Sequence, residues 1–334
     1  MMSQMTLRLG FRDFDPSHYD RFVEVRNANY PDRTVSVAEW RSWDDALDKT
    51  KYILKRFECL NQADGKILGF GEVHHVIDMF HPRKFMVNLL VDPPDQGKGI
   101  GRAIYNKISE QLADLNATVA WSLNKEDLPM RVEFFRRRGF YEKNKVWESR
   151  LDVTTAELSQ FNRYQENATK EGITFTTLAE EQRKGQDALR KIHELVQLIQ
   201  ADMPREAAFT PITYEQWEAL SLRNPRLLAD GYFIAKDGSK YIGMSNVLRN
   251  ETTPQVLSQD DTGVIREYRG RGIAIALKLK ITEYAQNHGY STIKTWNDST
   301  NAPMLAVNTK LGFKRQVGLI MMEKTLTPEA PIQE

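Results

Sequence analysis

Apolar residues recur along the chain with helical and strand periods, and the two halves show these periods in the same order. The first half predicts strands at residues 6–12, 52–60, 66–75, 85–91, 118–123 and 146–153, and helices at 16–29, 36–48, 99–112 and 129–138. The second half predicts strands at 174–178, in a hairpin over 232–248, at 292–296 and at 319–324, and helices at 187–199, 214–222, 273–286 and 301–310. This alternation predicts an α/β fold with a mixed, partly parallel central sheet flanked by helices in each half.

The two halves also share short motifs at a fixed distance of 173 residues. The repeated features are a glycine-rich loop, an asparagine and a Gly-Phe pair: Gln96-Gly-Lys-Gly-Ile-Gly101 and Arg269-Gly-Arg-Gly-Ile-Ala274, Asn124 and Asn297, Gly139-Phe140 and Gly312-Phe313. Two long copies indicate duplication of a whole domain rather than a solenoid. We therefore expect an N-terminal domain at 1–153, a polar linker at 154–171 and a C-terminal domain at 172–334.

Composition narrows the class of protein and its partners. The 334 residues carry 46 Lys and Arg against 45 Asp and Glu, which favours neither nucleic acid nor an anionic membrane as a partner. The single cysteine, Cys59, excludes an intramolecular disulfide framework and a cysteine-based zinc site, and we expect no metal. No apolar run approaches the roughly 20 residues that span a bilayer, and the start lacks the features of a leader. We expect a cytoplasmic protein, either monomer or homodimer.

Each glycine-rich loop joins a buried strand to a helix, an arrangement that presents backbone N–H groups and the positive end of the helix dipole to a phosphate. Neither loop fits a Walker motif, because Gly99 follows Lys98, nor a dinucleotide-binding motif, because Arg102 stands where that motif needs glycine. A purely structural elbow between strand and helix is the alternative.

The pattern Gln/Arg-x-x-Gly-x-Gly/Ala after a strand that ends in valine resembles the pyrophosphate loop of the GNAT superfamily of acetyltransferases. The resemblance covers nearly the whole chain as two tandem copies and implies acetyl-coenzyme A (acetyl-CoA) as acyl donor. It also implies a bulged strand before each loop, whose N–H groups bind the pantetheine arm. The residues so implied as cofactor-binding are Leu89, Leu90, Val91, Gln96, Gly97, Lys98, Gly99, Ile100, Gly101 and Arg102 in the first copy, and Thr262, Gly263, Val264, Arg269, Gly270, Arg271, Gly272, Ile273, Ala274, Asn297 and Asn301 in the second. The asparagines have a helix-capping role as their alternative.

The catalytic groups differ between the copies. Many relatives place a tyrosine four residues before the glycine of Gly-Phe, but here those positions hold Phe135 and Asn308. Asn308 can still donate a hydrogen bond to a developing thiolate. Asp261, beside Asp260, is the candidate general base, whereas the first copy has Asn88 at that position. The alternative for both aspartates is solvation of the strand entrance.

These observations favour an N-acetyltransferase that acts on the primary amine of a small molecule, with the C-terminal copy as the active one. The alternative is an acyl-CoA-binding or sensor protein in which one or both copies lack catalysis. A protein acetyltransferase receives no support from the near-zero net charge.

Overall fold

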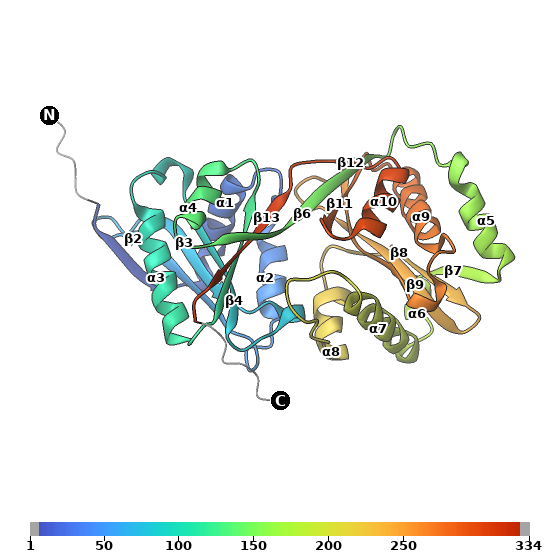
Figure 1. Ribbon diagram of the computed structural model, residues 1–334, viewed down its shortest axis with the longest axis horizontal. Coiled ribbons are helices and arrows are strands. Elements are labelled where there is room, and N and C mark those ends of the chain that lie inside the picture. Colours follow the sequence, from blue (N-terminus) through green and yellow to red (C-terminus); the bar gives the residue numbers. More distant parts are fainter. Residues whose placement is uncertain (1–6, 328–334) are drawn as a thin grey trace. The chain divides into compact units, whose positions relative to one another are not determined.

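The computed structural model describes residues 7–327, which form two compact units (Figure 1). Unit 1 contains the described residues up to Asn124, Leu128–Lys143 and those from Ile320 onward. Unit 2 contains Lys125–Asp127 and Asn144–Leu319. Each unit has its own run of adjacent strands, its own helices and its own apolar core.

Unit 1 has a mixed sheet in the order β1-β2-β3-β4-β5-β13. Its strands are β1 (Leu9–Asp13), β2 (Leu54–Asn61), β3 (Ile67–His74), β4 (Lys84–Val91), β5 (Val119–Lys125) and β13 (Leu319–Thr325), and its helices are α1 (Tyr19–Asn29), α2 (Val37–Asp45), α3 (Ile100–Asp114) and α4 (Pro129–Arg136). β1 to β4 pair antiparallel, whereas β4 and β5 are parallel. Helix α3 buries Ile100, Ile104 and Ile108, spaced by four, so that one apolar stripe faces the sheet.

Unit 2 repeats this plan with the order β6-β11-β10-β9-β8-β7. Its strands are β6 (Tyr141–Asp152), β7 (Ile173–Thr177), β8 (Leu227–Asp237), β9 (Lys240–Arg249), β10 (Val256–Val264) and β11 (Thr292–Asp298), with the short β12 (Lys314–Arg315) beside β6. Its helices are α5 (Asn162–Lys170), α6 (Leu178–Gln182), α7 (Gln186–Ala201), α8 (Tyr214–Trp217), α9 (Ile273–Asn287) and α10 (Ala302–Lys310). The predicted α/β class with mixed sheets is confirmed.

The last strand of each sequence copy belongs to the other unit. β6 ends the first copy, yet it pairs along Val146–Asp152 with β11, and its Leu151 is buried in the core of unit 2. β13 ends the second copy, yet Ile320 and Met322 lie in the core of unit 1. The units therefore differ from the expected bounds of 1–153 and 172–334. The physical reason is that an apolar pattern specifies a strand but not the sheet that it joins.

The segment expected to be a linker, residues 154–171, is also part of unit 2. It contains α5, and Phe161 and Ala168 are buried against the core of that unit. The helix was not predicted because the segment is mostly polar and only a narrow apolar face of α5 is buried. Residues 214–222, predicted as a single helix, form the short α8 followed by a π-helical turn at Glu218–Leu222.

Candidate active site

In unit 2, the site begins where two parallel strands separate. β10 and β11 pair only over Val256–Ser258 and Thr292–Lys294, and beyond that point the strands have no register with each other. β10 is bulged just there, because Gln259 lies opposite Val247 while Thr262 lies opposite Ser245. Two residues of β10, Asp260 and Asp261, lie between these two pairs where β9 has only one, so β10 has one extra residue here. A bulge breaks the regular ladder and leaves backbone groups free for a ligand. The resemblance implied a bulge at Thr262–Val264, but those residues pair regularly with β9, and the bulge lies just before them.

The glycine-rich loop that follows β10 has the backbone conformation of an anion-binding turn. Gly270 and Gly272 have φ of 79° and 80°, a region that favours glycine. Gly272 is the N-cap of the 15-residue helix α9, and no side chain caps this helix end. The first N–H groups of α9 and its dipole are thus available to a phosphate.

A cavity of about 560 Å³ connects the loop with the bulged strand. Nine of the residues predicted to bind the cofactor line it: Thr262, Gly263, Val264, Arg269, Gly270, Gly272, Ile273, Ala274 and Asn301. Its wall also includes Met304 and Val307 from α10 and Tyr164 from α5. Arg271 is not part of this lining; its guanidinium lies over the Tyr268 ring and 3.7 Å from the Glu171 carboxylate.

A smaller cavity of about 130 Å³ shares Thr262, Asn301 and Met304 with the first and lies beside the bulge. Asp260 and Asp261 both line it. Asp260 is exposed to this cavity, yet the surrounding protein desolvates its carboxylate and raises its pKa above the ordinary value, against the opposing effects of the Asn246 amide and Arg226. Asp261 accepts a hydrogen bond of 2.8 Å from Gln200 Nε2. Two carboxylates therefore line the smaller cavity, next to the larger one.

The three asparagines of the second copy have different surroundings. Asn297 lines the smaller cavity, and Asn301 lines both cavities while its side chain also caps α10 through the Met304 N–H at 3.3 Å. Asn308 is 2% exposed and lines neither cavity. Its Nδ2 donates to Asn297 Oδ1 at 2.7 Å, and its Oδ1 is buried without a partner. One N–H of the Asn308 amide is therefore bonded to Asn297, and the side chain does not reach either cavity.

The arginine that opens the second motif lines the larger cavity and also holds the loop in place. Arg269 Nε donates to the Val264 carbonyl at 2.8 Å, and its Nη2 is paired with Asp202 at 2.6 Å. Gln96 has the same place in the first unit, where its Nε2 donates to the Val91 carbonyl at 3.2 Å. Both side chains tie the loop to the last residue of the preceding strand.

The loop of unit 1 has the same backbone, but its surroundings differ. Gly97 and Gly99 have φ of 78° and 84°, and Gly99 is the N-cap of α3. Strand β4, however, pairs with β3 in unbroken register from Met86 to Val91, so the bulge expected at Leu89–Val91 is absent. The side chains of Leu89, Leu90 and Val91 are buried in the apolar cores. The prediction of a bulge in both copies was therefore wrong for the first.

A side chain also bridges the opening between β4 and β5. Arg131 of α4 donates from Nε to Asn124 Oδ1 at 2.9 Å and from Nη2 to Asn88 Oδ1 at 3.1 Å, and its guanidinium lies 5.4 Å from the centre of the Tyr30 ring. We call this set of contacts the Arg131 bridge. Asn88 and Asn124 are the equivalents of Asp261 and Asn297, and Arg131 is the equivalent of Met304, 173 residues later. The equivalents of these three residues line the smaller cavity of unit 2, so the Arg131 bridge spans the corresponding place in unit 1.

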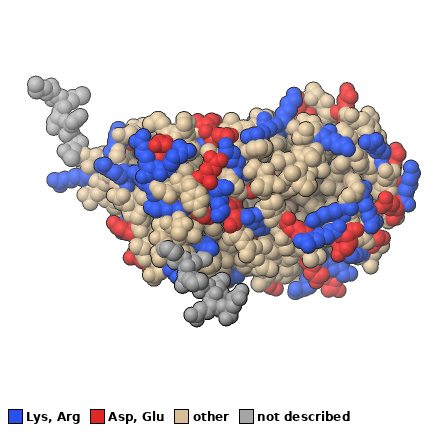
Figure 2. All heavy atoms as spheres, in the orientation of Figure 1, with Lys and Arg blue, Asp and Glu red and all other residues tan. Residues whose placement is uncertain are grey.

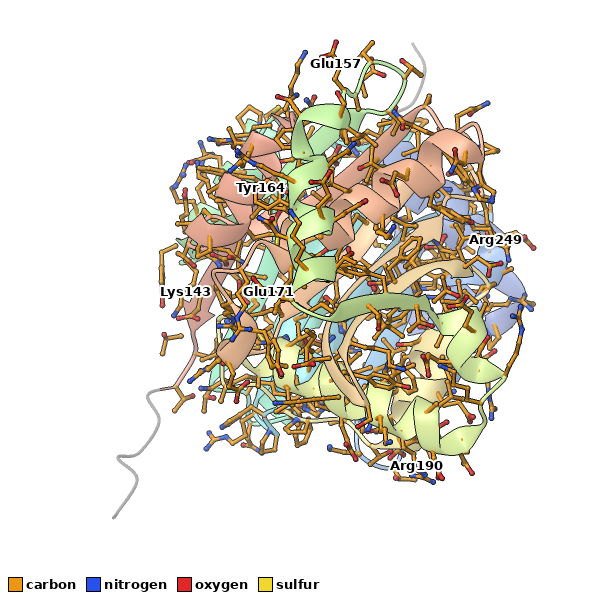
Figure 3. All side chains as sticks on the ribbon, turned by 90° about the vertical axis from the view of Figure 1, so that its right-hand side faces the viewer. Lys143, Glu157, Tyr164, Glu171, Arg190 and Arg249 are labelled. Atoms are coloured by element: carbon orange, nitrogen blue, oxygen red, sulfur yellow. The ribbon has the colours of Figure 1, made fainter. Side chains whose placement is uncertain are left out.

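The structure adds residues that the motifs did not identify. Tyr164, which Figure 3 labels on α5 and which lies in the first turn of that helix, packs so closely on the loop that a Cβ on Gly272 would lie 2.4 Å from its ring. Lys310 Nζ lies 2.5 Å from the Tyr164 hydroxyl and adds positive charge near the same cavity. Lys278 of α9 lines the smaller cavity. No sequence pattern distinguished these three residues, because each lies outside the repeated motifs.

On the face shown in Figure 2, Lys and Arg side chains lie among Asp and Glu, as the near-zero net charge indicates. Within residues 7–327, no helix has the length and apolar character needed to cross a membrane. The same residues contain no group of three or more His, Cys, Asp or Glu placed to hold a metal ion.

Comparison with known proteins agrees with the duplicated architecture. The sequence profile described as "Acetyltransferase (GNAT) family" matches residues 19–140 and 192–313, two segments that are again 173 residues apart (192 − 19). A mycothiol acetyltransferase from Amycolatopsis mediterranei (strain U-32) is 22% identical over 259 residues, which cover 76% of this chain and 79% of that protein.

Solved structures show the same fold at low sequence identity. A tandem GNAT protein from the clavulanic acid biosynthesis pathway has a TM-score of 0.73 at 17% identity, over 97% of this chain and 100% of that one. A GCN5-related N-acetyltransferase from Sphaerobacter thermophilus has a TM-score of 0.68 at 18% identity, over 96% and 97% of the two chains. Since the two profile matches together span well over half of its length, the chain belongs to the acetyltransferase (GNAT) family and carries that family's domain twice.

Proposed function

We propose that the protein is an acetyl-CoA-dependent N-acetyltransferase whose active site lies in unit 2 and whose acceptor is the primary amine of a small molecule. The observation that carries this proposal is the pair of connected cavities in unit 2, one against the glycine-rich loop and the other against two carboxylates. The residues fit the donor substrate, since a phosphate-binding helix end, an apolar groove and a strand bulge follow one another along one cavity.

The chemistry divides between these parts. The loop from Arg269 to Ala274 holds the pyrophosphate, and the bulge presents backbone N–H groups to the thioester carbonyl. The lone pair of the acceptor nitrogen forms the new C–N bond, the C–S bond breaks, and its electrons leave on sulfur. The nitrogen gives up one proton to the carboxylates at Asp260 and Asp261, as the sequence suggested for Asp261.

Unit 1 is proposed not to catalyse this reaction. Three observations support this: the unbulged β4, Asn88 in place of a carboxylate, and the Arg131 bridge across the opening. Its loop retains the glycine conformations, which hold the turn between β4 and α3 whether or not an anion binds. We further propose a cytoplasmic location, supported by the single, reduced and buried Cys59.

A matched pair of glycine variants tests the proposal. Gly97 and Gly270 are equivalent, their φ angles are 78° and 79°, and no atom lies within 4 Å of an added Cβ at either position. Glutamate therefore introduces the same backbone strain in both units. Release of free thiol from acetyl-CoA is measured with a panel of primary amines for the wild type, Gly97→Glu and Gly270→Glu.

The expected result is transfer by the wild type and by Gly97→Glu, and a loss of about 100-fold or more in Gly270→Glu, since repulsion of unit charges about 4 Å apart near a protein surface is worth about 4 kcal/mol. Loss of transfer in Gly97→Glu alone would contradict the assignment to unit 2. Binding of acetyl-CoA without transfer to any amine would favour the second candidate, an acyl-CoA sensor. The observation in favour of the sensor is that position 308 holds asparagine, where many relatives have a tyrosine that can donate a proton.

A further inference from the structure

The proposed reaction leaves one proton unassigned. When the C–S bond breaks, sulfur departs as a thiolate, and the position that many relatives fill with tyrosine holds Asn308. This amide donates to Asn297, lines neither cavity, and does not release a proton near neutral pH. The proton for sulfur therefore comes either from solvent or from another residue around the two cavities.

Lys278 is a charged residue in an unusual place. It lies in the second turn of α9, is 2% exposed, and lines the smaller cavity together with Asp261 and Asn297. Its Nζ lies 2.5 Å from Gln259 Oε1 and 4.9 Å from the centre of the Phe313 ring. Neither partner is a carboxylate. Burial of an amine without a counter-ion is costly, so a lysine at this position has to be explained by something other than stability.

The contacts of Lys278 connect it to the bulged strand. Gln259 accepts from Lys278 and donates from Nε2 to Ser245 Oγ at 2.9 Å and to Thr262 Oγ1 at 3.3 Å. Gln259, Ser245 and Thr262 are all buried, and Thr262 lines both cavities. These hydrogen bonds hold the amine of Lys278 next to the bulge of β10. Through Thr262, the same contacts reach the residues that the two cavities share.

We propose that Lys278 is a catalytic residue of unit 2 that donates a proton from Nζ to the departing sulfur. This inference rests on the proposed transferase function. In this step an N–H bond of the ammonium breaks, an S–H bond forms with the electron pair released from the C–S bond, and Lys278 is left as a neutral amine. It recovers a proton from solvent through the cavity before the next turnover.

The surroundings suit this step. Burial lowers the pKa of Lys278 to about 7, so the ammonium is a stronger acid than an ordinary lysine and is still substantially protonated near neutral pH. The ionisable groups that share the cavity are Asp260 and Asp261 from β10 and Asp298 from β11, whereas the hydrogen bond from Nζ goes to Gln259. In unit 1 the equivalent residue is Tyr105, whose hydroxyl accepts a hydrogen bond from Lys324 Nζ at 3.2 Å.

The test compares four variants of the full chain in acetyl-CoA binding and in the pH dependence of kcat. Lys278→Met removes the proton donor and keeps the length of the side chain. Lys278→Arg keeps a positive charge that does not dissociate. Gln259→Glu keeps Lys278 but places a carboxylate against it. Lys280→Met is the matched control, since Lys280 is on the same helix, lines neither cavity, and pairs with Glu283 at 3.6 Å.

The wild type is expected to lose kcat as the pH rises through the pKa of Lys278, because the acid must be protonated. Lys278→Met should bind acetyl-CoA like the wild type, lose about 100-fold or more in kcat, and lack this alkaline limb, which Lys278→Arg should not restore. Gln259→Glu should move the alkaline limb to higher pH, because an adjacent carboxylate stabilises the ammonium. Lys280→Met should match the wild type.

Each other outcome overturns the inference. Unchanged kcat in Lys278→Met, rescue by arginine, or loss of the acidic limb in place of the alkaline one would exclude proton donation by Lys278, while wild-type turnover would leave the transferase function standing. Absence of turnover in the wild type, despite acetyl-CoA binding, would instead overturn the proposed function, and the catalytic role of Lys278 with it.

Discussion

Lys278 shows how single residues set the properties of this site. Its side chain is buried next to an amide oxygen and an aromatic ring, and burial lowers its pKa from 10.5 to about 7. Between these two values the unfolded chain binds more protons than the folded protein. Stability therefore rises with pH across this window and is reduced at and below pH 7.

The exchange Lys278→Met is expected to raise stability while it lowers activity. The pKa difference corresponds to about 4 kcal/mol of destabilisation at pH 7, and leaving Gln259 Oε1 without a donor offsets about 1–3 kcal/mol of the gain. Thermal unfolding of both proteins from pH 6 to pH 10 checks this. The midpoint of the variant should exceed that of the wild type by several degrees near pH 7, and the difference should shrink towards pH 10. A variant that is less stable than the wild type at all pH values would contradict the claim that buried Lys278 lowers the stability of the protein.

The sequence predicted the residues of the site unevenly. Gly270, Gly272 and Asn301 lie in repeated motifs, and the structure brings them to one cavity. Lys278 could not be identified, because α9 is apolar on nearly every side and two lysines interrupt it two residues apart. Helical periodicity does not decide which of Lys278 and Lys280 faces inward when the apolar stripe covers most of the helix.

At the level of elements, the two units differ in the strand before the glycine-rich loop and in the helix before the Gly-Phe pair. β10 is bulged and α10 presents Met304, whereas β4 is regular and α4 presents Arg131. The family resemblance implied a bulge in both copies, yet a bulge depends on one residue of register that the apolar pattern does not specify. Helix α5 was missed for a related reason, since only Ala168 of its nine residues is buried.

Transfer of the Arg131 bridge to unit 2 tests the role of these helices. In Met304→Arg the new guanidinium should reach Asp261 and Asn297, the equivalents of Asn88 and Asn124, and close the opening between β10 and β11. We expect acetyl-CoA binding to fall by at least about 100-fold with little loss of thermal stability, because the charge gains a carboxylate partner. The control Arg131→Met, measured by the same calorimetric titration, should bind like the wild type. Normal binding by Met304→Arg would show that the groove does not run past this residue.

At the scale of the whole chain, duplication has been followed by exchange of the final strands. Each copy has a strand, β5 or β11, whose last neighbour comes from the other copy: β13 lies beside β5, and β6 lies beside β11. The order of elements was therefore readable from the sequence, but the assignment of the last strand to a unit was not. As a result, unit 1 is completed by a segment that is distant in sequence, from Ile320 onward, whereas unit 2 is mainly the continuous stretch Asn144–Leu319.

A pair of truncations within the cores tests the exchange. Met322→Ala removes buried volume from unit 1, and Leu151→Ala removes it from unit 2; each should cost about 2–5 kcal/mol. In hydrogen exchange measured by mass spectrometry, Met322→Ala should loosen β4, β5 and α3, whereas Leu151→Ala should loosen β10, β11 and α9. The opposite assignment would place each strand with its own sequence copy and contradict the exchange.

The most direct test of the central claim is the stoichiometry of acetyl-CoA binding to the intact protein by isothermal titration calorimetry. One molecule per chain is expected, with the same value in Gly97→Glu and no binding in Gly270→Glu, because only unit 2 combines the loop, the bulge and an open groove. Two molecules per chain would show that the Arg131 bridge does not close unit 1. No binding at all would contradict the account of the donor site and the proposed reaction.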